Sequence, residues 1–229
     1  MKEPLIGIIG KLDFTNDKPL PYKVMGFGCN YLTALDKFNV NYIGIMTNSK
    51  YKNIDEEILK LCDGFLFQGG SEIRDCYKKI VLYAYNNKIP VLGICLGMQI
   101  IGTTFSNYPE EKILNSVNNI SSFKHAPKLN KISDRKKIVH KVVLKENSTL
   151  YKLFGSNIEV NSRHKHCLNN INYPLEVTAY SEDGIIEGIE LIDKKQFMIG
   201  VQWHPENIKN NEILFKEFIR NVFIYYKNK

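Results

Sequence analysis

The sequence of 229 residues is 44% hydrophobic and 24% charged, which fits one soluble globular domain of ordinary composition. No apolar run approaches the 18 residues of a membrane-spanning helix, so we expect no membrane partner. The formal net charge is +7, but the lysines are spread among acidic residues without interleaved aromatics, so we expect no nucleic-acid partner and, at most, a preference for an anionic substrate.

Short apolar runs alternate with amphipathic segments through the first half of the chain. The run at 5–10 is too short for a signal-peptide core, and we expect it to form a buried strand. After it we expect helices at 23–38, 54–62, 72–87 and 96–105, alternating with strands at 41–46, 64–68 and 90–94. This alternation predicts a parallel sheet with helices on both faces.

The second half of the chain changes character. We expect shorter strands at 142–144, 158–161, 176–180, 185–191 and 197–202, and a terminal helix at 210–226. The polar, lysine-rich segment 106–137 is weakly periodic and predicts a surface excursion that borders the functional site. Because no linker is apparent, the prediction is an α/β fold with a mostly parallel central sheet, in a single domain over 1–229.

The cysteines indicate the cellular compartment. None of the five forms a C-x-x-C pair, so the spacing typical of a zinc site is absent. The odd count, without a secretion signal, predicts free thiols in a reducing, cytoplasmic location. The five are Cys29, Cys62, Cys76, Cys95 and Cys167.

One cysteine stands in a segment of the form G-x-C-x-G, Gly93-Ile94-Cys95-Leu96-Gly97, between a predicted strand and a predicted helix. This is the cysteine counterpart of the G-x-S-x-G nucleophile elbow, whose small neighbours let the chain pass through a strained turn. Such a turn would place the sulfur above the carboxyl edge of the sheet, where open α/β sheets bind ligands. The positive end of the following helix would favour the thiolate. A buried core cysteine is the competing explanation.

A nucleophilic cysteine needs a base, and the base needs a third group that orients it. His204 follows the apolar strand at 197–201, so it is expected at the same sheet edge as Cys95. Glu206 comes two residues later, and in an extended segment both side chains would face the same side. The competing explanation is a strand-ending turn with Glu206 in solvent, but the shared edge favours a catalytic group.

Three motifs in order along the chain resemble the class I glutamine amidotransferase superfamily, and more closely its γ-glutamyl hydrolase branch, the C26-type peptidases. They are Gln68-Gly69-Gly70, Gly93-Ile94-Cys95-Leu96-Gly97-Met98-Gln99 and Val201-Gln202-Trp203-His204-Pro205-Glu206. The resemblance implies a flavodoxin-like three-layer sandwich. It also implies a catalytic triad of Cys95, His204 and Glu206.

The same resemblance implies an oxyanion hole and part of a substrate pocket. The oxyanion would be held by the backbone N–H groups of Gly70 and Leu96. Gly69 would let the backbone approach the substrate closely. Gln99, one helical turn beyond the nucleophile, would help to line the glutamyl pocket.

A further stretch, Val160-Asn161-Ser162-Arg163-His164-Lys165-His166, resembles the N-S-x-H segment of γ-glutamyl-amine hydrolases. It implies substrate contacts from Ser162, Arg163 and His164, with Arg163 holding a carboxylate bidentately. The alternative is a surface turn with solvated basic residues, which we favour for His166. The two remaining histidines, at positions 125 and 140, have no supporting context and are expected at the surface.

The sequence departs from the family pattern in two places. Ser71-Glu72 follows Gly69-Gly70 where the family has G-G-x-D, and the glycine-rich stretch expected after the nucleophile helix is missing. These departures leave the substrate open. They do not touch the residues expected to carry the chemistry.

We therefore predict a cysteine-dependent hydrolase that cleaves the γ-glutamyl amide bond of a small γ-glutamyl-amine or related compound. It would release glutamate through a glutamyl-thioester intermediate, with no metal or organic cofactor. One alternative is the glutaminase subunit of an amidotransferase, which delivers ammonia to a separate synthase partner. A non-catalytic ligand-binding module is another, although the three intact triad residues argue against it.

Overall fold

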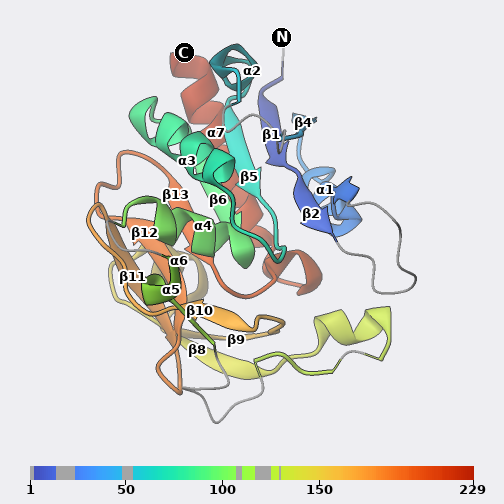
Figure 1. The fold of residues 1–229 in the computed structure, drawn as a ribbon, viewed down its shortest axis with the longest axis vertical. Helices are drawn as coiled ribbons and strands as arrows, with labels where there is room; N and C mark the ends of the chain where they lie inside the picture. The colour runs from blue at the N-terminus through green and yellow to red at the C-terminus, as the bar shows by residue number, and fades with distance from the viewer. Residues whose placement is uncertain (1–2, 14–23, 48–53, 107–109, 117–124, 129) are drawn as a thin grey trace.

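A nine-stranded mixed sheet forms the centre of the part of the chain that the structure, a computed structural model, describes: residues 3–13, 24–47, 54–106, 110–116, 125–128 and 130–229. Figure 1 shows this sheet with helices on either side. In spatial order the strands are β4 (Asn41–Ile45), β1 (Leu5–Ile9), β5 (Gly64–Phe67), β6 (Val91–Ile94), β13 (Met198–Val201), β12 (Ile186–Leu191), β11 (Leu175–Ser181), β8 (His140–Leu144) and β9 (Asn157–Val160).

The sheet has a parallel half and an antiparallel half. From β4 through β1, β5 and β6 to β13, adjacent strands are parallel. From β13 through β12, β11 and β8 to β9, adjacent strands are antiparallel, so β13 is the boundary between the two halves. In the parallel half, Ile94 at the end of β6 pairs with Val201 at the end of β13. The segments that follow these two strands therefore leave the sheet at the same carboxyl edge.

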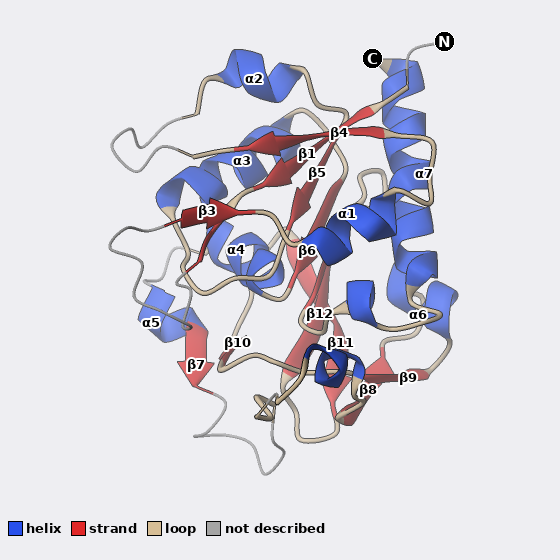
Figure 2. Cartoon of the chain, turned by 90° about the vertical axis from the view of Figure 1, so that its right-hand side faces the viewer, coloured by secondary structure: helices blue, strands red, loops and turns tan. Residues whose placement is uncertain are grey.

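Two layers of helices cover the sheet (Figure 2). On one face lie α2 (Glu56–Lys60), α3 (Asp75–Asn86) and α4 (Leu96–Thr104); on the other lie α1 (Cys29–Leu35), α6 (Thr149–Phe154) and α7 (Glu212–Asn228). The sequence explains this arrangement, because successive side chains of a strand point to opposite faces. In β5, Phe65 and Phe67 pack with α3 and α4, whereas Leu66 packs with α7.

The apolar stripe of α7 shows why the terminal segment is helical. Its buried residues recur at a spacing of three to four, which places them on one face of a helix. They are Leu214, Phe215, Phe218, Ile219 and Val222. These residues pack against the sheet and complete the apolar core on the face that α1, α6 and α7 cover.

Short strands and helices lie in the loops on the carboxyl side of the sheet. Strand β2 (Lys11–Asp13) pairs with β3 (Val24–Gly26), and β7 (Leu114–Ser116) pairs with β10 (His166–Leu168). Helix α5 (Glu110–Ile113) precedes β7, and the 3₁₀ helices η2 (Ile132–Lys136) and η3 (Pro205–Asn207) lie in loops. No helix among the residues described is both long enough and apolar enough to cross a membrane.

The predicted flavodoxin-like sandwich is confirmed, and apart from the unexpected strands β2 and β3 the order of strands and helices is as expected through α4. The helix expected at 23–38 is wrong in its first part: residues 24–26 form β3, and the helix starts only at Cys29. Gly26 and Gly28 weaken a helix there despite the apolar spacing. The segment 106–137 has more structure than expected, although its residues 107–109, 117–124 and 129 lie outside the described part.

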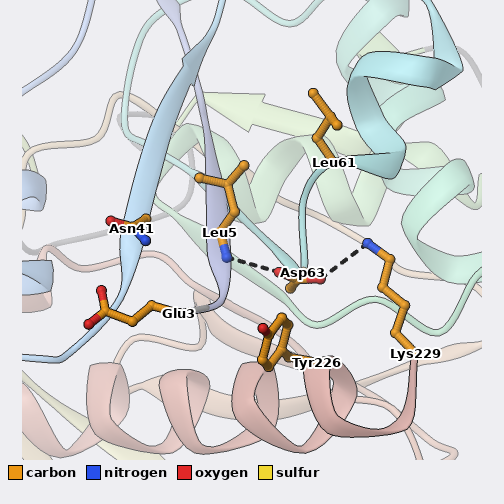
Figure 3. A pocket seen from close by; sticks show the side chains of 7 residues that line it. All are labelled: Glu3, Leu5, Asn41, Leu61, Asp63, Tyr226 and Lys229. Carbon is orange, nitrogen blue, oxygen red and sulfur yellow. Dashed lines mark hydrogen bonds and ion pairs between the residues drawn. The ribbon is translucent and has the colours of Figure 1, made fainter. Parts of the chain in front are cut away.

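A cavity of about 950 Å³ lies at the amino ends of β1 and β5. In Figure 3, the carboxylate of Asp63 joins two ends of the chain: it accepts from the Leu5 N–H at 2.9 Å and from Lys229 Nζ at 3.1 Å. Open α/β sheets bind ligands at the opposite, carboxyl edge. We therefore assign these contacts to stability and look for the site at the carboxyl edge.

Candidate active site

The turn from β6 into α4 has the backbone strain expected of a nucleophile elbow. Cys95 has φ 55° and ψ −104°, a backbone conformation that residues other than glycine rarely adopt. Its glycine neighbours are required by close contact. A Cβ at Gly97 would lie 2.3 Å from the Phe67 carbonyl oxygen, and one at Gly93 would lie 2.7 Å from the Gly97 backbone. The strand and the helix can therefore meet tightly enough to hold the cysteine at the sheet edge.

The segment after β13 brings a histidine and a glutamate together. His204 Nδ1 lies 2.8 Å from Glu206 Oε1, so Nδ1 donates to the carboxylate and Nε2 is left for another partner. The expected extended segment is wrong, because Pro205 opens the 3₁₀ helix η3. Proline suits the first position of a helix. The tight turn, and not an extended backbone, carries Glu206 back to the imidazole.

Charge within this group favours an ion pair between Cys95 and His204. Burial alone would raise the pKa of the Cys95 thiol, but the charge of His204, the hydrogen bond to it and the charges of His164 and Arg163 lower that pKa overall. Burial would lower the pKa of His204, yet Glu206 and Cys95 raise it to about 9. A thiolate beside an imidazolium is the state that a cysteine nucleophile needs.

Further contacts hold the histidine and the glutamate, and these were not predicted from the sequence. The side chain of Asn161 accepts from the His204 N–H at 2.8 Å and donates to the His204 carbonyl at 3.0 Å. Glu206 Oε1 also accepts from Asn207 Nδ2 at 2.6 Å and from Arg163 Nη2 at 3.2 Å. The expected role of Arg163 as a substrate clamp therefore changes, since one of its amino groups already binds Glu206.

Tyr31 is another unpredicted member of the site. Its hydroxyl accepts from the Gly69 N–H at 3.0 Å and lies 3.4 Å from His204 Nδ1. A Cβ at Gly69 would lie 2.8 Å from His204 Cε1 and 3.4 Å from Cys95 Cβ. The absence of a side chain at Gly69 is therefore what lets the loop after β5 approach the cysteine and the histidine.

The two residues expected to form the oxyanion hole are neighbours. A Cβ at Gly70 would lie 2.9 Å from Leu96 Cδ2. Leu96 is the first residue of α4, where backbone N–H groups lack helical partners and the helix dipole is positive. The arrangement can place two backbone donors next to Cys95, as binding of a developing oxyanion requires.

A cleft of about 520 Å³ opens over these residues. Four of its lining residues are Gly69, Gly70, Cys95 and Arg163, and the expected border by the segment 106–137 is confirmed through Ile132 and Arg135. The others are Lys11, Gly28, Cys29, Asn30, Tyr31, Ser71, His204 and Glu206. Lys11, Arg135 and Arg163 give the cleft several cationic groups, which suit a ligand that carries a carboxylate.

The other expected substrate contacts lie behind the cleft. Gln99 donates to the His166 carbonyl at 2.8 Å and to Gln202 Oε1 at 3.0 Å, and its side chain is buried. Ser162 donates to the His125 carbonyl at 2.7 Å. In place of a substrate contact, we therefore assign these two side chains to the support of the surrounding loops.

Three histidines are buried together behind the same cleft. His125 and His140 were expected at the surface, but they are 1% and 6% exposed. Both face Glu187, as does His164, which is 3% exposed. The surface prediction was wrong because the sequence around each histidine gives no sign of a glutamate on a distant strand.

Comparisons with known proteins identify relatives of this chain. The sequence model of the family described as Peptidase C26 matches residues 71–206, more than half of the chain. A candidate glutamine amidotransferase of Schizosaccharomyces pombe is 36% identical over 142 residues, which cover 60% of this chain and 52% of that protein. A CTP synthase of Flavobacterium psychrophilum is 31% identical over 252 residues, covering 99% of this chain and 46% of that protein. The chain thus spans about half the length of both relatives.

A solved structure shares the fold. The glutaminase domain of a Trypanosoma brucei CTPS, with bound acivicin, aligns with a TM-score of 0.62 and 19% identity over 95% of this chain and 94% of that one. At this identity the likeness concerns the fold alone. The family match extends across the elbow and the His204–Glu206 segment. The chain therefore belongs to the peptidase C26 family, a branch of the glutamine amidotransferase-like superfamily.

Proposed function

We propose that the protein hydrolyses the γ-glutamyl amide bond of a small molecule, with Cys95 as nucleophile, His204 as acid and base, and Glu206 as the group that orients His204. The observation that carries this proposal is the convergence of the strained Cys95 turn and the hydrogen-bonded His204–Glu206 pair on one cleft at the carboxyl edge of the sheet. Buried thiols without such partners are inert, whereas an ion-paired thiolate is an effective nucleophile.

In the first half of the reaction, the Cys95 thiolate attacks the δ-carbonyl carbon and forms the carbon–sulfur bond. The negative charge moves to the carbonyl oxygen, which accepts hydrogen bonds from the backbone N–H groups of Gly70 and Leu96. The imidazolium of His204 donates its Nε2 proton to the amine as the carbon–nitrogen bond breaks. The products of this half are a free amine and a glutamyl thioester.

In the second half, water enters the position that the amine has left. Neutral His204 takes a proton from that water, which attacks the thioester, and glutamate leaves as the Cys95 thiolate re-forms. Glu206 stays ionised throughout, because its role is to hold Nδ1 and to stabilise the imidazolium. The cationic groups of the cleft suit the α-carboxylate of the glutamyl group.

The test is a glutamate-release assay with a panel that contains glutamine and several γ-glutamyl amines. Cys29 lines the same cleft and is exposed, so Cys29→Ala is a matched control for Cys95→Ala. We expect wild type and Cys29→Ala to release glutamate and Cys95→Ala to release none. Equal turnover by Cys95→Ala would refute the nucleophile assignment. Labelling by an electrophilic glutamine analogue, read by peptide mass spectrometry, gives an independent readout and should modify Cys95.

A second candidate function is the glutaminase of an amidotransferase, whose ammonia passes to a synthase. The alignment of 99% of the chain with 46% of a CTP synthase favours it. The free-standing hydrolase is favoured by the family match. Turnover of γ-glutamyl amines by the purified chain alone would favour the hydrolase. Glutamine turnover that appears only with a synthase partner would favour the glutaminase.

A further inference from the structure

Four ionisable side chains meet in a buried cluster behind the active-site cleft. They are His125, His140 at the start of β8, His164, and Glu187 in β12, and they are between 0% and 6% exposed. One ligand atom of each lies within 4.8 Å of the others. We refer to these four residues as the histidine cluster. The proposed hydrolysis uses none of them directly, so their convergence needs its own explanation.

The outer nitrogens of the three imidazoles fix how the rings are protonated. His125 Nε2 lies 3.1 Å from Asp183 Oδ2, and His164 Nδ1 lies 3.0 Å from the His166 carbonyl oxygen. Both partners can only accept, so these nitrogens carry protons. His140 Nδ1 faces the carbonyl oxygen of the next residue at 3.4 Å. In the neutral rings, the three remaining nitrogens therefore carry lone pairs.

These three nitrogens and a carboxylate oxygen of Glu187 lie close together, within 4.8 Å of one another. His125 Nδ1 lies 3.1 Å from His164 Nε2, a contact that is repulsive if both are acceptors. Neither oxygen of Glu187 accepts a hydrogen bond within the described part of the chain, and the same holds for His140 Nε2. A buried carboxylate without a partner is strongly unfavourable. The four inward atoms therefore need a positive charge among them. It could come from a metal ion or from a proton on His164, whose pKa burial would lower but Glu187 raises overall.

The distances from the Glu187 carboxylate to the three inward nitrogens match those around a metal ion. Tetrahedral Zn²⁺ with bonds of about 2.0–2.2 Å holds its ligand atoms about 3.3–3.6 Å apart. Glu187 Oε1 lies 3.5 Å from His125 Nδ1, 3.4 Å from His140 Nε2 and 3.4 Å from His164 Nε2. The outer contacts also match, because metal-bound histidines donate their second N–H to a carboxylate or a backbone carbonyl.

We propose that the histidine cluster binds one Zn²⁺ ion through His125 Nδ1, His140 Nε2, His164 Nε2 and Glu187 Oε1. Four protein ligands leave no open position, so the ion is structural. It joins the segment at 125–128 and the loop at 161–164 to strands β8 and β12. The expectation of no metal rested on the spacing of cysteines, and a site built from histidines on separate elements leaves no such spacing.

The test measures metal in the full chain, purified without an affinity tag that binds metal. We expect inductively coupled plasma mass spectrometry to find about one zinc ion per chain. After chelation, one equivalent of Co²⁺ should give the visible absorption of a tetrahedral site, and Zn²⁺ should raise the midpoint of thermal unfolding. Wild type that binds neither ion, as purified or after reloading, would overturn the proposal, with protons then holding the cluster together.

Four variants decide where the metal sits. Glu187→Gln and His140→Gln should each lose stoichiometric metal. His166→Ala is the matched control, because this histidine is exposed and lies beside the cluster, and it should keep the metal. Cys95→Ala should keep it as well. Metal that is lost in Cys95→Ala, or a thiolate charge-transfer band with Co²⁺ in wild type, would place the ion on the cysteine and overturn the assignment, and this readout does not depend on whether the Glu187 variant folds.

Discussion

Replacing Glu206 by glutamine tests whether its charge sets the protonation of His204. The amide keeps the shape of the carboxylate, and its oxygen can accept from the three donors that now meet Glu206 Oε1 at 2.6–3.2 Å. Its NH₂ group would replace Oε2, which has no hydrogen-bond partner among the described residues. The substitution Glu206→Gln therefore removes charge with little change in geometry.

The size of the effect follows from the pKa of His204, which is raised to about 9. This lies roughly 2.5 above the ordinary value of about 6.5, which corresponds to about 3.4 kcal/mol in favour of the imidazolium. Glu206 is the largest of the contributions that raise it, followed by Cys95. Removing the charge of Glu206 should therefore lower the pKa of His204 toward its ordinary value, and this whole difference of about 3.4 kcal/mol sets the scale of the effect.

The sign of the pH effect follows from the proposed role of His204 as an acid. The imidazolium protonates the amine, so kcat/KM should decline at high pH as His204 loses its proton, near pH 9 in wild type. In Glu206→Gln this decline of kcat/KM should move to lower pH. The rise at low pH should move little, because His204 is protonated there in both proteins and Cys95 ionises beside the same charge.

Two measurements check the prediction: kcat/KM from pH 5 to pH 10, and an NMR titration of the His204 ring carbon. Glu212→Gln is the matched control, because it also removes one carboxylate, an exposed one that pairs with Lys37 at the surface. The control should titrate like wild type. A His204 midpoint that is the same in Glu206→Gln as in wild type, or a wild-type midpoint near 6.5, would show that this carboxylate does not control the base.

Three further substitutions test the support of the site. Tyr31→Phe leaves the buried N–H of Gly69 without its acceptor at 3.0 Å. The free energy of unfolding, measured in urea, should fall by about 1–3 kcal/mol. An unchanged value would mean that the hydroxyl does not stabilise the loop at Gly69. Asn161→Ala removes both contacts to the His204 backbone, so stability should fall by about 2 kcal/mol and kcat should fall more than KM rises, whereas normal kcat would contradict a positioning role. Gly97→Ala places a Cβ 2.3 Å from a carbonyl oxygen of β5 and should yield little folded protein by circular dichroism; wild-type stability would refute the packing argument.

The parts of the site that could be predicted are those in which the chemistry is local in the sequence. Cys95 and its glycines occupy five consecutive positions, and His204 and Glu206 are two residues apart. The same is true of the fold, because each strand–helix unit of the first half carries its own periodicity. A three-residue strand such as β3 is too short to show the alternation of apolar and polar residues that marks a strand. The sequence therefore predicts that the helix begins at residue 23.

The parts that could not be predicted depend on contacts between distant elements. Tyr31 reaches Gly69 across 38 positions, and Asn161 reaches His204 across 43. Nothing near either residue in the sequence marks it, because the pairing is created only when α1 and the loop after β9 meet the sheet edge. The burial of His125 could not be predicted for the same reason, because its partner Glu187 belongs to the distant strand β12.

The loop at 161–164 lies between the histidine cluster and the proposed triad of Cys95, His204 and Glu206. Asn161 and Arg163 face the His204–Glu206 segment, whereas Ser162 and His164 face the cluster. Side chains alternate between two sides in an extended stretch, so one short loop can be held by both groups. A change in the cluster would therefore reach the triad through the positions of Asn161 and Arg163. We therefore expect substitutions in the cluster to lower kcat, because they would shift the residues that hold His204 in place.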